Sequence, residues 1–142
     1  MKQQFDIYLS DNFRLSEFVI SEISIKQKLE KQFLIPLGIV ANLQRLCTEI
    51  LQPARDIIQI PILVNSGYRC DALNKLVGGS SFSQHLHGNA ADITCMFNFD
   101  LFNIIKDNCP YDQLICYGKP DQPRFLHVSL SENPRHQILY RP

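Results

Sequence analysis

The chain has 142 residues, of which 45% are hydrophobic and 20% are charged. This length is sufficient for one domain with a buried core, and we predict a single domain over residues 1–142. Fourteen Lys and Arg residues balance fourteen Asp and Glu residues, so the formal net charge is zero. A balanced charge argues against a nucleic-acid or membrane-surface partner, because both of these partners bind clustered positive charge.

No apolar stretch reaches the roughly 18 residues of a membrane-spanning helix, so no membrane span is expected. The N-terminal sequence MKQQFDIYLSDNF lacks the apolar segment and the small-residue cleavage site of a signal peptide. We therefore expect synthesis in the cytoplasm. We also expect a monomer. The five cysteines form no CxxC pair and are expected to be buried, reduced thiols.

The first half of the chain is predicted to be helical. The segments LSEF (15–18) and SIKQKLEKQ (24–32) predict short helices or turns. From residue 37 to residue 58, apolar residues recur at steps of three and four, which predicts a helix with one apolar face that covers a sheet. Pro53 is expected to kink or interrupt this helix, because proline lacks the amide donor and clashes with the preceding turn.

The second half is predicted to contain most of the strands. Strands are expected at 61–69 (running into a loop), 90–94, 111–117, 124–130 and 137–140, and helices at 70–79 and 101–108. Asp100 or Asn98 is expected to cap the second of these helices. Helices followed by short strands and one late helix indicate the α+β class. We predict a small, mainly antiparallel sheet with helices packed on one face.

The segment SSFSQHLHGNAADI (80–93) contains two of the four histidines. On a continuous helix, His85 and Asp92 would stand about 10 Å apart, too far for one metal ion. Gly88 permits a tight turn, which would let the strand residue Asp92 converge with His85. Zinc accepts imidazole nitrogen and carboxylate oxygen at about 2 Å. The pair could therefore supply two zinc ligands.

A third ligand could come from the predicted strand RFLHVSL (124–130). Alternate residues of this strand are aliphatic and belong in the core: Leu126, Val128 and Leu130. His127 lies on the opposite face and is free to point toward a cleft. Three protein ligands with an open position for water are the arrangement of catalytic zinc. The alternatives are that His127 is a hydrogen-bonded structural residue and that Asp92 caps a turn.

The segments SGYRCDALNKLVGGSSFSQHLHGNAADI, YDQLI and FLHVSL resemble the zinc D-alanyl-D-alanine carboxypeptidase family. Relatives in this family include vancomycin-resistance dipeptidases and bacteriophage endolysins. The family pattern SxHxxxxxxD, followed by a distant strand histidine, is met by Ser83, His85, Asp92 and His127. The segments NFRLSEF, LQPARD and NPRHQILY are similar to the subgroup common in phages, so that the resemblance covers nearly the whole chain.

The resemblance implies a Hedgehog/DD-peptidase-like fold and a zinc peptidase that acts on peptidoglycan stem peptides after release or export by other machinery. In such a protein, His85, Asp92 and His127 would hold Zn²⁺. Arg69 would steady the substrate and its polarised carbonyl, because guanidinium remains charged and donates in a fork. Ser83 would hydrogen-bond the substrate. The alternatives are that Arg69 is a surface or salt-bridging arginine and that Ser83 is an N-cap or forms a turn.

One departure from the family concerns the general base. Many relatives have Glu or Asp three residues before the last zinc histidine, or His two residues before it, where this chain has Arg124 and Phe125. Tyr117 stands where some relatives have Glu. Five other side chains could accept a proton: His87, Asp112, Asp121, Glu132 and His136.

Three functions therefore stay open. The first is an active zinc peptidase, acting as a carboxypeptidase, dipeptidase or endopeptidase. The second is a zinc-retaining module of the same fold that binds the cell wall or has a structural role and has lost its base, because a fold does not determine a function. The third is a metal-free domain in which His85 and Asp92 brace a turn.

Overall fold

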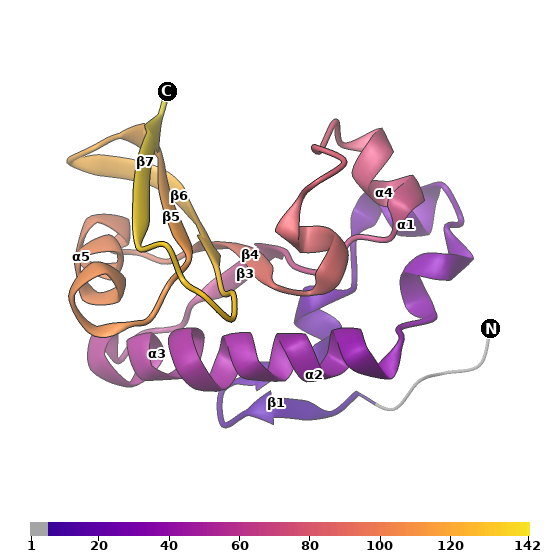
Figure 1. The fold of residues 1–142 in the computed structure, drawn as a ribbon, viewed down its shortest axis with the longest axis horizontal. Coiled ribbons are helices and arrows are strands. Elements are labelled where there is room, and N and C mark those ends of the chain that lie inside the picture. Colours follow the sequence, from indigo (N-terminus) through magenta and orange to yellow (C-terminus); the bar gives the residue numbers. More distant parts are fainter. Residues whose placement is uncertain (1–5) are drawn as a thin grey trace.

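A computed structural model of the chain describes residues 6–142. Its first half contains β1 (Tyr8–Ser10), β2 (Phe13–Arg14), η1 (Leu15–Phe18), α1 (Glu22–Lys26), η2 (Glu30–Phe33), α2 (Leu37–Leu46), η3 (Cys47–Leu51) and α3 (Gln52–Ile58). Its second half contains β3 (Leu63–Ser66), α4 (Asp71–Leu76), η4 (Gln84–His87), β4 (Ala90–Thr94), α5 (Asn98–Asn108), β5 (Gln113–Lys119), β6 (Gln122–Ser129) and β7 (Gln137–Arg141). Figure 1 shows a long helix, α2 to α3, along the base of the molecule, with α5 and strands β5 to β7 above one end and α1 and α4 above the other.

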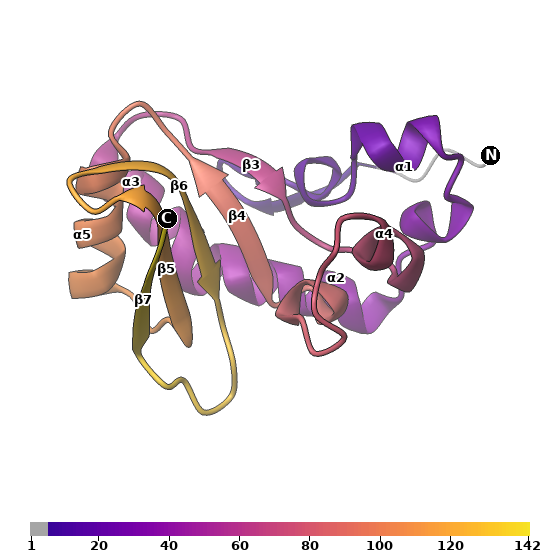
Figure 2. The same ribbon diagram turned by 90° about the horizontal axis from the view of Figure 1, so that it is seen from above.

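The main sheet has five strands in the order β3-β4-β6-β5-β7. The first four of these strands pair antiparallel, and β7 adds to β5 in parallel. Figure 2 shows the strands side by side from above, with the long helix beneath them. The predicted α+β class is confirmed, and the mainly antiparallel sheet carries one parallel edge strand. Strands β1 and β2 form a separate antiparallel pair.

The long helix continues through Pro53 because its hydrogen-bond register changes before the proline. Helix α2 passes into the π-helical segment η3, after which the Gln52 amide donates to the Cys47 carbonyl. Pro53 then lies at the N-terminal end of α3. A π-bulge absorbs the loss of one α-helical hydrogen bond without ending the helix. The expected interruption is therefore a change of register in a continuous helix (Figure 1).

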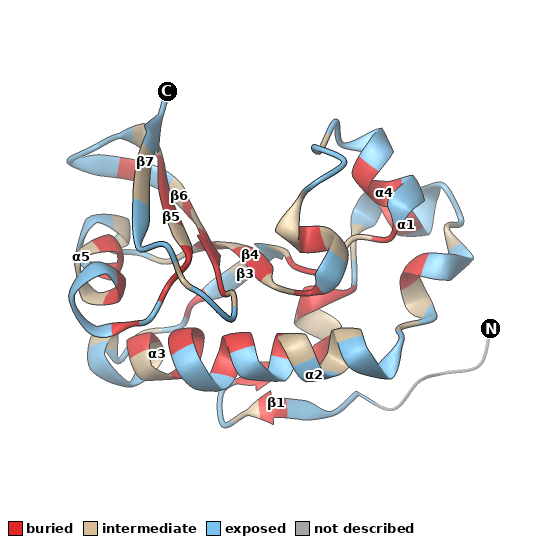
Figure 3. Cartoon of the chain, in the orientation of Figure 1, coloured by how far each residue is buried: buried red, intermediate tan, exposed pale blue. Residues whose placement is uncertain are grey.

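The apolar face of the long helix packs under the sheet, as the periodicity predicts. The fully buried residues of this face are Leu43, Leu46, Cys47, Ile50, Leu51 and Ala54. They belong to one core cluster with the strand residues Ile93, Leu126 and Val128. Figure 3 shows buried residues along the upper side of the helix and on the strands that face it. In the described part of the chain all five cysteines are free, and four of them are buried.

Helix α5 begins earlier than its sequence predicts, and the expected capping residue is wrong. Phe97 occupies the N-cap position, and neither Asp100 nor Asn98 does. Asn98 instead accepts a hydrogen bond from the Cys95 amide at 2.8 Å and donates to the Thr94 hydroxyl at 2.9 Å. This side chain therefore closes the turn between β4 and α5. No helix within residues 6–142 is long and apolar enough to cross a membrane.

We expect Gly67→Ala to lower the free energy of unfolding by about 1–3 kcal/mol, the usual range for overpacking a close contact. A Cβ at Gly67 would lie 2.7 Å from the Cα and carbonyl oxygen of Phe18. The Tyr68 amide, next in the chain, already donates to that carbonyl at 2.7 Å. Urea denaturation measures the change. Gly38→Ala is the matched control, because nothing lies within 4 Å of its Cβ position. Equal effects of the two changes would contradict this close packing.

Candidate metal centre

His85 is held by a short turn that the sequence encodes on both sides. The Ser83 hydroxyl accepts a hydrogen bond from the His85 amide at 3.2 Å, which caps η4. Gly88 ends the turn with a φ of 72°, a left-handed conformation that glycine adopts without strain. The chain then enters β4, which carries Asp92. The predicted turn at Gly88 is confirmed, and it leaves the His85 side chain only 3% exposed.

Asp92 and His127 face each other across the pairing of β4 with β6, where they are direct register partners. His127 Nδ1 lies 2.9 Å from Asp92 Oδ1, and His85 Nε2 lies 3.3 Å from the same oxygen. The two imidazole rings are arranged edge to face, with centroids 5.1 Å apart. One ligand atom from each of the three residues lies within 4.8 Å of the other two. The fold thus brings together the three residues that the sequence singles out.

The donor chemistry and orientation of this His85–Asp92–His127 cluster fit one zinc ion. His85 Nδ1 lies 2.7 Å from the Gly67 carbonyl, so this nitrogen has an outer partner and Nε2 is the nitrogen that faces Asp92. Metal-binding histidines are usually oriented by such an outer partner. Two imidazoles and one carboxylate are a ligand set typical of catalytic zinc. Between residues 6 and 142, it is the one group of three His, Cys, Asp or Glu residues with ligand atoms this close.

Asp92 is ionised in this arrangement. Burial raises the pKa of its carboxyl, but hydrogen bonds from His127 and His85 outweigh that effect and hold the pKa well below its usual range. The Arg69 guanidinium adds a positive charge, with Nη2 lying 3.5 Å from Asp92 Oδ2. The deprotonated carboxylate is the form that binds a metal ion.

Arg69 is held beside the cluster by contacts along its whole guanidinium. Its Nε donates to the Ser66 hydroxyl at 3.2 Å, and its Nη1 donates to the Asn74 side-chain oxygen at 3.1 Å. Its backbone amide donates to the His85 carbonyl at 3.0 Å. A side chain on Gly79 would collide with Asn74 and displace it. Because the Arg69 side chain is only 14% exposed, it is an oriented cation within the site.

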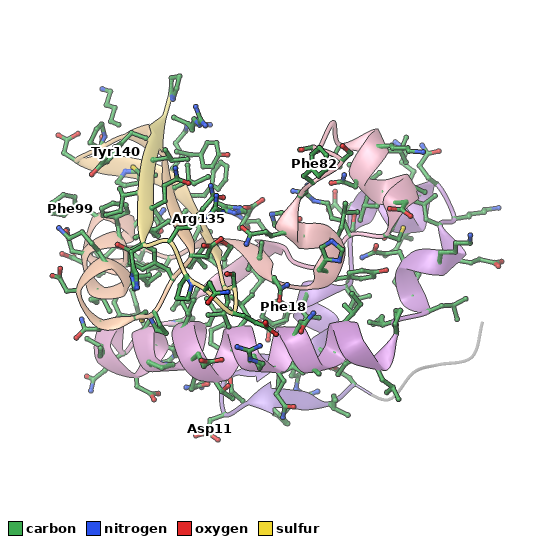
Figure 4. All side chains as sticks on the ribbon, viewed as in Figure 1. Asp11, Phe18, Phe82, Phe99, Arg135 and Tyr140 are labelled. Carbon is green, nitrogen blue, oxygen red and sulfur yellow. The ribbon has the colours of Figure 1, made fainter. Side chains whose placement is uncertain are left out.

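A cleft of about 580 Å³ opens over these residues. It is lined by the metal cluster, by Arg69 and Ser83, and by alternate residues of β5: Gln113, Ile115 and Tyr117. Phe82 and Arg135 line it as well, and Figure 4 shows them on opposite sides of the opening. The volume falls in the range of small-ligand sites. The cleft can therefore accept a short peptide segment next to the cluster.

Apart from the metal cluster, the cleft lining within residues 6–142 contains no carboxylate or imidazole. Four of the side chains considered as bases are exposed and lie outside the lining: His87, Asp121, Glu132 and His136. Phe125 stacks on Tyr117, with ring centroids 4.4 Å apart. Position 125, where many relatives have a histidine, is therefore occupied by one ring of an aromatic pair.

Asp112, the fifth possible base, is held by four hydrogen bonds. Arg135 donates to it from the backbone amide, Nε and Nη2 at 2.8, 3.0 and 2.7 Å. Gln84 Nε2 donates at 2.8 Å. The Asp112 side chain is 2% exposed, and hydrogen bonding from Arg135 lowers its pKa to about 2. Asp112 thus connects the turn that carries His85 to the segment before β7, a role that the sequence did not indicate.

We expect Asp112→Asn to lower the free energy of unfolding at pH 7 by about 2 kcal/mol. The folded pKa of about 2 lies below the ordinary 3.8, so the carboxylate stabilises the fold above about pH 4. This contribution is lost as the pH falls from about 4 to about 2. Urea denaturation across this range should show a smaller loss of stability for Asp112→Asn than for the unmodified protein. Asp121→Asn, at an exposed position, should retain the original pH dependence. If Asp112→Asn retains it too, the ion pair does not stabilise the fold.

Two imidazoles and a carboxylate that converge at a cleft, beside a fixed arginine, define the arrangement of a catalytic metal centre. Comparison with known protein families matches residues 12–129 to Peptidase M15. The chain belongs to the peptidase M15 family, and the resemblance to zinc D-alanyl-D-alanine carboxypeptidases is confirmed. The matched range includes Arg69, Ser83 and all three residues of the cluster. A search of curated proteins found no match.

Proposed function

We propose that this protein is a zinc-dependent peptidase that hydrolyses D-amino-acid-containing stem peptides of peptidoglycan. The observation that supports this most strongly is the convergence of His85, Asp92 and His127 within 4.8 Å in a chain of the peptidase M15 family. These three residues would hold the ion. Zinc, when bound, supplies a water of lowered pKa and a Lewis acid for the scissile carbonyl.

Arg69 is the residue we propose to stabilise the charge that develops on the substrate carbonyl oxygen. Ser66, Asn74 and Asp92 already orient its guanidinium, so little reorganisation is needed when that charge appears. Burial lowers the pKa of Arg69, but an arginine guanidinium is not deprotonated in proteins near neutral pH, so the side chain is charged there. Arg69 is thus a proposed catalytic residue.

Ser83 is the residue we propose to position the substrate from the same side of the cleft. Its oxygen accepts the hydrogen bond of the His85 amide. A hydroxyl that accepts one hydrogen bond still has its own hydrogen to donate. The two roles considered for Ser83, capping the turn and contacting the substrate, are therefore compatible.

One observation favours a second function, a zinc-retaining module that binds the cell wall without cleaving it. The only carboxylate and imidazoles that line the cleft within the described chain are those of the metal cluster. A general base must lie within hydrogen-bonding reach of the water it activates, or one water away. In the peptidase proposal, solvent must take the proton, because Asp92 is a ligand of the metal and its pKa is held low, whereas the binding module needs no base.

Incubation of the zinc-loaded protein with purified peptidoglycan separates the two functions. For a peptidase, mass spectrometry should detect peptide fragments or D-alanine, whose release depends on zinc and stops when a chelator is added. For the binding module, the protein should sediment with the wall and release nothing. Failure of the folded protein to cleave under any metal loading would contradict the peptidase proposal. The released fragments also identify the bond that is cleaved.

A further inference from the structure

Arg135 brings a second arginine to the cleft, from the segment between β6 and β7. It lines the same cleft as Arg69 and the metal cluster, and its side chain is 56% exposed. Figure 4 shows it across the opening from Phe82, which is 91% exposed. A ligand that reaches the metal cluster therefore lies within a space that Arg135 also borders.

The Arg135 guanidinium is held in one orientation by the buried Asp112. Nε and Nη2 donate to the two oxygens of this carboxylate at 3.0 and 2.7 Å. Asp112 also accepts from Gln84, next to His85 in the chain, so it connects the guanidinium to the turn that forms the metal cluster. Because Asp112 is 2% exposed and accepts four hydrogen bonds, it orients the arginine and offers no oxygen to a ligand.

Part of the guanidinium is left for a ligand. Of its five N–H groups, two point at Asp112, and within residues 6–142 no hydrogen bond runs from Nη1. The edge formed by Nη1 and Nη2 carries two parallel N–H groups, the geometry that matches a carboxylate in a bidentate pair. Asp92 is the only acidic residue among the described residues that line the cleft, and we assign it to the metal. The cleft therefore favours an acidic ligand.

We propose that Arg135 binds a carboxylate of the substrate and thereby determines which peptides the cleft accepts. This inference rests on the proposed function for the peptide nature of the substrate. The carboxylate belongs to the C-terminus of the peptide or to an acidic side chain, since both offer the same two oxygens. Arg135 is then a specificity-determining residue, and Asp112 is the residue that positions it.

Two pairs of peptides ending in D-alanyl-D-alanine test the proposal and distinguish the two sources of the carboxylate. One pair differs in a free or amidated C-terminus, and the other in a D-glutamate or D-glutamine side chain. Calorimetric titration of the zinc-loaded protein at low temperature gives the affinities, and mass spectrometry shows whether each peptide stays intact. One acid should bind about 10- to 100-fold more tightly than its amide, the range for a charge-assisted bidentate pair.

Arg135→Gln should remove this preference and leave the affinity for the amide unchanged. Arg135→Lys keeps the positive charge next to Asp112, and should fold and show a reduced preference, because an ammonium cannot form the fork. Arg45→Gln is the matched control: Arg45 also pairs with a carboxylate, Glu49, at 3.2 Å, but it lies outside the cleft lining. It should retain the full preference.

Equal binding of acid and amide by the unmodified protein, or an unchanged preference in folded Arg135→Gln and Arg135→Lys, would overturn the proposal. The outcome for the peptidase function is read separately. Cleavage of any of the four peptides supports that function whatever the ratio of acid to amide. If the protein binds acids selectively but cleaves neither peptides nor peptidoglycan, the role of Arg135 is supported and the peptidase function is contradicted.

Discussion

Asp92→Asn is expected to weaken zinc binding by at least ~100-fold, since even the loss of an outer partner of a metal ligand costs 10–100-fold. Asp92 is the one anionic member of the cluster, and a single oxygen of its carboxylate lies 2.9 Å from His127 and 3.3 Å from His85. Asparagine has nearly the same shape as aspartate but no charge, so a zinc ion would keep the two imidazoles and lose its anionic ligand. Competition with a chromophoric zinc chelator measures the affinity.

The control for this change is Asp107→Asn, because Asp107 is an exposed residue of α5 outside the cleft lining. This variant should bind zinc as the unmodified protein does. Circular dichroism should show that both variants keep their secondary structure. If Asp92→Asn retains the original affinity, the carboxylate is not a zinc ligand, and the candidate metal centre is wrong.

Arg69→Gln is expected to lower kcat for peptide hydrolysis by about 10²- to 10³-fold, the usual effect of removing one donor to a developing oxyanion. The amount of bound zinc should stay the same, because Arg69 and the histidines contact different oxygens of Asp92. Arg69 Nη2 lies 3.5 Å from Oδ2, whereas His127 Nδ1 lies 2.9 Å from Oδ1. Zinc-loaded protein and a fluorogenic peptide provide the kinetic measurement. Metal analysis of the same sample provides the zinc content.

Arg69→Lys serves as the graded control. Lysine keeps the charge but cannot reproduce the contacts to Ser66 and Asn74 that orient the guanidinium, so it should recover only part of the lost activity. Two results would count against the proposed role. One is an unchanged kcat in Arg69→Gln, and the other is a loss of activity that follows a loss of zinc.

The local patterns of the sequence predicted most of the elements that form the metal centre. Alternation in the strand of His127 placed this residue opposite the buried Leu126 and Val128, and the structure pairs it with Asp92 across the sheet. The glycine at residue 88 predicted the turn that brings His85 and Asp92 together. Each of these inferences rests on a period or a turn that a few neighbouring residues determine.

The features that were not predicted depend on contacts between distant segments. Asp112 and Arg135 are 23 residues apart, and no periodicity relates a strand-entry aspartate to a loop arginine. The parallel pairing of β7 with β5 and the change of helical register before Pro53 also depend on tertiary packing. The departure at Phe125 was visible in the sequence, but its stacking on Tyr117 was not.

X-ray absorption at the zinc edge of the zinc-loaded protein tests the metal centre most directly. We predict one zinc per chain, with two imidazole nitrogens and oxygen ligands at about 2.0–2.2 Å and no sulfur. The described chain has five free cysteines, and zinc bound by their sulfur atoms would give a longer metal–ligand distance. Sulfur neighbours at about 2.3 Å, or a protein that binds no zinc, would contradict a centre formed by His85, Asp92 and His127.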